Sequence, residues 1–258
     1  MATAPDALVV FHAFLAKPGA RDKLGRFIQY GTRILRGVIN EYIKGSAPGD
    51  HAALRAFLVK NQSLMFWLMH SRRTFRWFKS TAALLALRRV LLRGGACPWG
   101  EGLDRKLFVV SRLLLVAWHL GDHTRWLTLI KWLPGGNPRM ASLRRFSFGC
   151  FSIAQFLTTV HHLPRAFPGV FHHGGGGGGD GVPVSWGGGG RKSVDTDPEA
   201  VRKARRACLK AALCTLTFCH VSELAKSHDV VCGVAAMVTS WMDMMDLWPS
   251  EAEKLKHV

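Results

Sequence analysis

The segment from Leu54 to Arg93 carries nine Lys or Arg residues and no Asp or Glu, and six aromatic residues are spread among these cations. At about 100° per residue, positions 72–85 of this segment separate into two faces of a helix. Cations gather on one arc, and apolar and aromatic residues occupy most of the other. The first arc holds Arg72, Arg73, Arg76, Lys79 and Ser80, and the second holds Thr74, Phe75, Trp77, Phe78, Ala82, Leu84 and Leu85.

Cations opposite large apolar groups are typical of a helix that lies in the interface of an anionic membrane. The alternative is a basic surface helix whose apolar face packs on the protein's own core, and this segment alone favours that alternative. Other features of the sequence are therefore needed to show whether lipid or protein covers the apolar face.

Charge and hydropathy together favour a membrane. The formal net charge of +18 restricts the expected partners to anionic surfaces, such as phospholipid headgroups or nucleic acid. Residues 1–93 hold 16 Lys or Arg against 4 Asp or Glu and so supply +12 of this charge. The mean hydropathy is nevertheless positive, whereas basic nucleic-acid binders are usually hydrophilic. Six scattered cysteines without a CxxC pair predict reduced thiols in a cytosol-facing protein, with no disulfide framework.

Helical periodicity dominates the chain, and no strand-type alternation stands out, so the predicted fold class is all-α. An amphipathic helix is expected over 20–44 and another helix over 102–121. The run 51–70 is apolar nearly all round, which predicts burial on several sides. Asp197, Pro198 and Glu199 are typical of the start of a further helix.

The predicted organisation is a membrane-associated helical bundle with amphipathic N-terminal helices and one or two C-terminal hydrophobic membrane segments. The uncharged stretch 146–163 is at the lower length limit for a span, and a buried core helix explains it equally well. The number of full spans stays open between none, one and two. Four regions are expected: a cytosol-facing amphipathic region 1–143, a hydrophobic segment 144–168, a Gly-rich flexible linker 169–195, and C-terminal helices 196–258 with a membrane segment at about 230–248.

No catalytic, cofactor or metal site is predicted, and we expect no enzyme. The stretch from Gly187 to Ser193 lacks the glycine spacing of a phosphate-binding loop. The paired histidines His161–His162 and His172–His173 lack the spacing of a known metal site, and no GxSxG elbow is present.

Three short blocks in order carry a family resemblance. These are GARDKLGRFIQYGTR at 19–33, SRRTFRWFK at 71–79 and DHTRWL at 122–127. Together with the last apolar run, they resemble the peroxisomal biogenesis factor 11 family. The residues that carry the match in the first and third blocks are Arg21, Asp22, Lys23, Arg26, Gln29, Tyr30, Arg33, Asp122, His123 and Trp126.

The resemblance implies a peroxisomal membrane protein that remodels and elongates the membrane and promotes peroxisome fission and proliferation. It implies an N-terminal region facing the cytosol, an amphipathic helix inserted into the outer leaflet of an anionic phospholipid membrane, self-association, and cooperation with dynamin-type fission machinery. The helix would fall within 54–85. Its expected membrane-binding residues are Arg72, Arg73, Phe75, Arg76, Trp77, Phe78 and Lys79.

Two other functions remain open at this point. A pore for small metabolites in the peroxisomal membrane would use polar helix faces, such as that of 20–44, to line a channel. A basic nucleic-acid-binding adaptor would use the clustered arginines and aromatics for phosphate contacts and base stacking. Against the adaptor, the aromatics of 72–85 lie opposite the cations, and the chain carries no zinc-finger or RNA-motif signature, so no nucleic-acid partner is expected.

Overall fold

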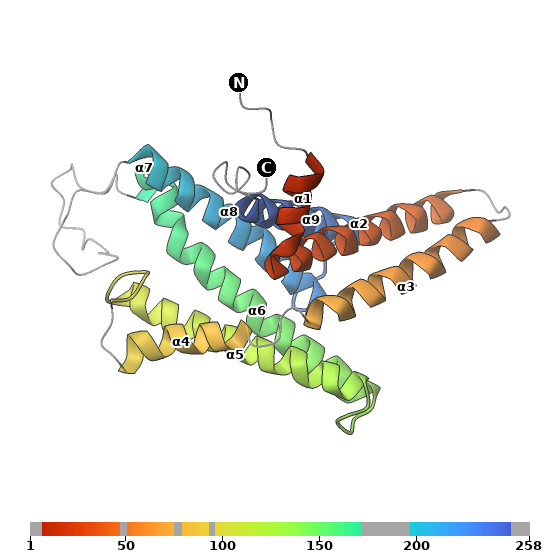
Figure 1. The fold of residues 1–258 in the computed structure, drawn as a ribbon, viewed down its shortest axis with the longest axis horizontal. Coiled ribbons are helices and arrows are strands. Elements are labelled where there is room, and N and C mark those ends of the chain that lie inside the picture. Colours follow the sequence, from red (N-terminus) through yellow and green to blue (C-terminus); the bar gives the residue numbers. More distant parts are fainter. Residues whose placement is uncertain (1–6, 47–50, 75–78, 93–95, 172–196, 249–258) are drawn as a thin grey trace. The chain divides into compact units, whose positions relative to one another are not determined.

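The computed structural model describes residues 7–46, 51–74, 79–92, 96–171 and 197–248, and all the regular elements in these ranges are helices (Figure 1). The predicted all-α class is confirmed. The chain divides into two compact units, one formed by residues 1–77 with 227–258 and the other by residues 78–226. The first unit joins both ends of the chain, so its contacts link residues that are about two hundred positions apart.

The first unit is built around α2. Its elements are α1 (Ala7–Ala16), α2 (Pro18–Gly45), α3 (Ala52–Thr74) and α9 (Asp229–Leu247). Helices α3 and α9 both pack on α2, and the start of α2 contacts α1. The α2 and α9 helices are antiparallel, because Gly19 lies beside Leu247 whereas Gly37 lies beside Val230. Phe14, Ala20 and Met244 form the buried apolar cluster at the α1 end of this unit.

Two glycines let α2 and α9 approach closely. A Cβ atom on Gly37 would lie 2.7 Å from Val230 Cγ2, and one on Gly233 would lie 2.6 Å from Ile34 Cγ1. Both distances are too short for two carbon atoms in contact. The glycines therefore act as holes on each helix that receive a branched side chain from the other.

The second unit is layered around α6. Its elements are α4 (Lys79–Leu92), α5 (Leu103–Leu129), α6 (Asn137–Ala166), α7 (Pro168–Phe171) and α8 (Pro198–Val221). Helix α6 packs on α5 and α8, and α4 packs on α5. Phe151 of α6 contacts Trp118 of α5 and Phe218 of α8 at ring-centroid distances of 4.3 Å each. This aromatic group is part of the core of the unit.

Most local predictions of helices are confirmed. The amphipathic helix 20–44 lies within α2, and the helix expected over 102–121 forms the first part of the longer α5, which begins at Leu103. Helix α8 begins at Pro198, and the Asp197 side chain accepts a hydrogen bond of 3.0 Å from the Glu199 backbone N–H. The cap was predictable because it depends only on neighbouring residues.

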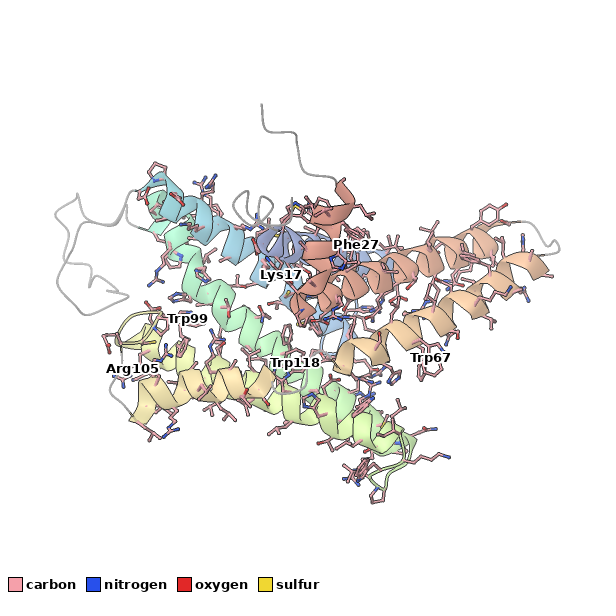
Figure 2. All side chains as sticks on the ribbon, in the orientation of Figure 1. Lys17, Phe27, Trp67, Trp99, Arg105 and Trp118 are labelled. Atoms are coloured by element: carbon pink, nitrogen blue, oxygen red, sulfur yellow. The ribbon has the colours of Figure 1, made fainter. Side chains whose placement is uncertain are left out.

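The predicted burial of 51–70 on several sides is wrong. Helix α3 packs mainly on α2. Five large apolar side chains of α3 are between 41 and 70 % exposed: Phe57, Val59, Leu64, Phe66 and Trp67. Figure 2 shows Trp67 on the side of α3 that faces away from α2. All-round apolarity thus reflects exposed apolar surface here, not a central position in a protein core.

Among the described residues, α9 is the one helix long and apolar enough to cross a membrane. The uncharged stretch 146–163 lies inside the 30-residue helix α6, between α5 and α8, and does not meet that criterion. Most of the predicted linker, from 172 to 195, lies outside the described residues, and the short helix α7 precedes it.

Candidate functional site

The polar side of α2 binds α9 through ion pairs. Lys23 Nζ lies 2.6 Å from Asp243 Oδ2, and Arg26 donates from Nη2 to Thr239 Oγ1 at 3.1 Å. Farther along, Arg33 Nη2 lies 2.6 Å from Asp229 Oδ1. Lys23, Arg26 and Arg33 therefore tie the first sequence block to the last helix of the chain. Two further residues of the block sit nearby: Tyr30 is buried, with the Arg26 guanidinium 5.7 Å from its ring centroid, and Arg21 is exposed.

The same helix binds α3 on another side. Arg72 donates from Nε to Asp22 Oδ1 at 3.0 Å and from Nη1 to Gln29 Oε1 at 2.5 Å. Asn61 donates from Nδ2 to the Thr32 carbonyl oxygen at 2.7 Å. The first and second family-like blocks thus recognise each other directly through Asp22, Gln29 and Arg72.

Arg72 and Arg73, which the sequence places on the cationic arc expected to meet headgroups, are both buried in the first unit. The physical reason is local for Arg72: the Asp22 carboxylate and the Gln29 amide oxygen offer it charge-assisted hydrogen bonds that compensate its burial. Phe75, Arg76, Trp77 and Phe78 lie outside the described residues, and so does the side chain of Lys79. Membrane binding by these residues stays a prediction.

Exposed apolar surface next to cations occurs instead on α3 and α4. On α3 the exposed Arg55 and Lys60 accompany the five exposed apolar side chains named above. On α4 the buried positions Ala83, Leu87 and Val90 face α5, whereas Leu84, Leu85, Leu91 and Leu92 are exposed beside Arg88 and Arg89. Contiguous exposed apolar groups are common at protein–protein and membrane interaction sites.

The third block lies on α5, in the second unit. Asp122 is buried, and the His123 ring stacks on that of His119 at a centroid distance of 6.1 Å, while Trp126 is partly buried one turn farther on. A Cβ on the neighbouring Gly121 would lie 2.7 Å from Ser147 Oγ, so this block marks a close approach of α5 and α6. No three His, Cys, Asp or Glu side chains of the described ranges come together as metal ligands.

A polar cluster around the buried His161 in the second unit was not predicted from the sequence. His161 Nδ1 lies 2.9 Å from Asp104 Oδ1, and Arg165 donates to Asp104 Oδ2 at 2.8 Å and to the His161 carbonyl oxygen at 2.7 Å. The His161 ring stacks on Trp99 at a centroid distance of 4.2 Å. Only the spacing of His161 and Arg165, one helical turn apart, hinted at it.

The environment shifts the protonation of this cluster. Burial lowers the pKa of His162 to about 4, and the neighbouring His161 and Arg165 act in the same direction. Burial also lowers the pKa of His161, against the opposing hydrogen bond with Asp104. Burial alone would raise the pKa of Asp104, but the hydrogen bonds from Arg165 and His161 bring it below its ordinary value. At neutral pH the cluster therefore holds neutral histidines beside an Asp–Arg ion pair.

These features define an all-α protein in which ion pairs join α2 to α3 and α9, and in which α3 and α4 each leave apolar side chains exposed. A family model, Peroxisomal biogenesis factor 11 (PEX11), matches residues 8–166, which is more than half of the chain. The chain belongs to this family. No curated protein sequence and no solved structure matches it. Family membership assigns the protein to peroxisome biogenesis and to the peroxisomal membrane, in a family of biogenesis factors and not of enzymes.

The matched region covers all three sequence blocks and ends with α6, so the resemblance seen in the sequence is confirmed. Helices α8 and α9 lie beyond it. The ion pairs between α2 and α9 therefore join the matched part of the chain to a helix outside the match.

Proposed function

We propose that the protein remodels and elongates the peroxisomal membrane by inserting an amphipathic helical surface into its outer leaflet, and that this promotes peroxisome fission and proliferation. The observation that carries the proposal is the exposure of Phe57, Leu64, Phe66 and Trp67 on α3 beside Arg55 and Lys60. Aromatic and aliphatic side chains next to cations suit the boundary between headgroups and acyl chains.

The proposed mechanism is physical. Each Lys or Arg close to an anionic leaflet contributes about 1 kcal/mol of attraction. The apolar side chains then enter between the acyl chains of one leaflet, which expands that leaflet and favours positive curvature. The segment 75–79 continues the same chemistry in the sequence, and we propose that Phe75, Trp77 and Phe78 belong to the inserted wedge and Arg76 and Lys79 to its cationic rim.

Arg72 and Arg73 are buried, so they are less suitable than the exposed residues of α3 for testing this proposal. Because Arg72 holds α3 on α2, its removal would disturb the fold as well as any headgroup contact. Substitution of exposed residues on α3 is therefore the cleaner test. The polar face of α2, which the pore hypothesis assigned to a channel, is occupied by α3 and α9 through Asp22, Arg26 and Arg33, and this occupancy argues against a channel lined by α2.

The test uses the full-length protein added to vesicles of phosphatidylcholine with and without phosphatidylserine, observed by electron microscopy. We expect tubules from the anionic vesicles, and severalfold fewer with the double variant Phe57→Ala and Trp67→Ala. Gln62→Ala, an exposed polar position of the same helix, is the matched control and should match the unsubstituted protein. Equal tubulation by the aromatic double variant and the control would contradict the proposal.

Self-association and recruitment of dynamin-type fission machinery belong to the same proposal, with the N-terminal region on the cytosolic side. The proposal predicts that cells lacking their own family member contain fewer and rounder peroxisomes when they express the α3 double variant than when they express the control variant. Chemical cross-linking of the membrane fraction should give multimers of the chain.

A further inference from the structure

Helix α9 has two chemically different sides. The side toward α2 carries Asp229, Gly233, Thr239 and Asp243, which make the ion pairs, the hydrogen bond and the close approach described above. At 100° per residue, Asp229 and Asp243 fall on the opposite side of α9 from a row of apolar residues. That row repeats at i, i+3, i+7, i+10 and i+14 and is 40 to 52 % exposed: Val231, Val234, Val238, Trp241 and Met245.

Helix α2 carries a second apolar row. Its members repeat at i, i+7, i+10 and i+14 and are 41 to 60 % exposed: Ile28, Leu35, Val38 and Tyr42. The cations of α2 that bind α9, Lys23, Arg26 and Arg33, lie on the other side of the helix.

The two rows lie on the same face of the α2–α9 pair. The Phe27 ring is 6.3 Å from the Trp241 ring, and Gly31 faces Met237. Phe27 and Gly31 border the α2 row, whereas Trp241 belongs to the α9 row and Met237 borders it. The contact line between the helices therefore runs alongside both rows, and together they form one apolar face, called here the α2–α9 face.

Charge compensation keeps that face free of ions. Asp243 and Arg26 are both buried, and Asp229 is bound by Arg33 and Arg36. If α9 crossed a bilayer alone, Asp229 and Asp243 would enter the hydrocarbon or its edge without their partners, which is unfavourable. Bound to α2, both carboxylates point away from the apolar face and are neutralised.

We propose that α2 and α9 lie side by side in the plane of one leaflet, with the α2–α9 face against the acyl chains, and that α9 does not cross the membrane on its own. This assignment rests on the proposed function in one respect, namely that the protein works on a lipid surface. It adds a second inserted surface, separate from α3, whose formation requires both ends of the chain.

Lipid fits this face better than a second protein copy does. The face presents aliphatic side chains with Tyr42 toward one end and Trp241 toward the other, and aromatic residues of this kind favour the membrane interface. One-sided exposure also matches an in-plane helix pair, because a spanning pair would face lipid on several sides.

The test measures membrane depth in the full-length protein. A fluorescent amino acid is introduced at one exposed position at a time, Ile28, Leu35, Val234 or Val238, and the protein is bound to vesicles of phosphatidylcholine and phosphatidylserine. The phosphatidylcholine carries bromine quenchers at a shallow or a deep acyl position. Asn40, which is exposed on another side of α2, is the matched control.

We expect all four positions to be quenched most by the shallow bromines, by about threefold or more relative to Asn40, since in-plane helices sit at one depth. Quenching that deepens toward the middle of α9, with Ile28 and Leu35 unquenched, would show that α9 crosses alone and would overturn the proposal. Absence of quenching at all four positions, with cross-linking between copies at Leu35, would show a protein interface and would also overturn it.

Tubulation is recorded in the same samples, so the two proposals fail separately. Uniform shallow quenching without tubules would contradict the proposed remodelling and leave the in-plane seating of α2 and α9 in place. Tubules without quenching at the α2–α9 face would contradict the in-plane seating of α2 and α9 and leave the proposed remodelling in place.

Discussion

Arg72, near the end of α3, donates a hydrogen bond of 3.0 Å from Nε to the Asp22 carboxylate of α2, and both side chains are buried. Its stem passes over Gly25, where a Cβ would lie 3.1 Å from Arg72 Cγ. Glycine at position 25 lowers the helix propensity of α2, but the absence of a Cβ there leaves room for the Arg72 side chain to reach Asp22. The pair thus adds a buried ion pair to the contact between α2 and α3, beside the hydrogen bond from Asn61 to the Thr32 carbonyl oxygen.

Arg72→Ala should destabilise the protein strongly, because it leaves the Asp22 carboxylate buried without its arginine. Breaking a buried ion pair from one side costs about 3–5 kcal/mol. Thermal unfolding in detergent, followed by far-UV circular dichroism, checks this. Arg88→Ala, at an exposed arginine of α4, is the control and should change the free energy of unfolding by about 0.5 kcal/mol or less. Equal effects of the two variants would show that the Arg72–Asp22 pair does not stabilise the fold.

Gly233→Ala should also be destabilising, because its Cβ would lie 2.6 Å from Ile34 Cγ1. Overpacking of this kind costs about 1–3 kcal/mol. The double variant Gly233→Ala with Ile34→Ala removes the obstructing side chain and should recover part of the loss from the clash. Gly45→Ala, where no atom lies within 4 Å of the new Cβ, is the control and should be neutral. A double variant less stable than the sum of its single variants would contradict the clash.

Sequence reasoning located helices well because caps and periodicity are local, as Asp197 at the start of α8 shows. It could not find the partners of the charged residues, since Lys23 and Asp243 are separated by 220 positions and nothing local links them. It placed Arg72 on a cationic arc expected to meet headgroups, because the period of a helix separates its faces without saying which face binds a neighbour. The same limit explains α3, whose apolar residues turned out to be exposed.

The cluster around Asp104 was missed for a related reason. Asp104 begins α5 whereas His161 and Arg165 end α6, so the group exists only after the two helices pack. The metal hypothesis considered for His161 and His162 asked about ligand spacing along the chain. The structure instead gives His161 a carboxylate partner and an aromatic stacking partner, Trp99.

The two aspartates of α9 offer a matched comparison. The Asp243 side chain is 9 % exposed and binds Lys23 and Arg26, whereas that of Asp229 is 35 % exposed and binds Arg33 and Arg36. Asp243→Asn should cost about 3 kcal/mol, since it leaves buried cations uncompensated. Asp229→Asn should cost about 1 kcal/mol or less, because water screens the more exposed pair. Unfolding by urea at low salt measures both, and the reverse ranking would contradict the assigned burial of these ion pairs.

Stability should fall as the pH drops below about 6.5, and His162 is the main reason. Its pKa is lowered to about 4 in the folded protein, so between about pH 6.5 and pH 4 the unfolded chain binds a proton that the folded chain does not. His161 and Asp104, whose pKa values are also lowered, act in the same direction, Asp104 at lower pH.

His162→Gln removes the imidazole that binds this proton in the unfolded chain and should make the free energy of unfolding less dependent on pH. We expect the loss of unfolding free energy between pH 7 and pH 4.5 to shrink by about 2 kcal/mol, allowing for partial solvent screening of His162. His12→Gln, at an exposed histidine of α1, is the control and should keep the full dependence. Because the folded state excludes the proton, His162→Gln should help the protein at pH 4.5 more than at pH 7. A variant that lowers stability equally at both pH values would show that His162 acts through packing alone.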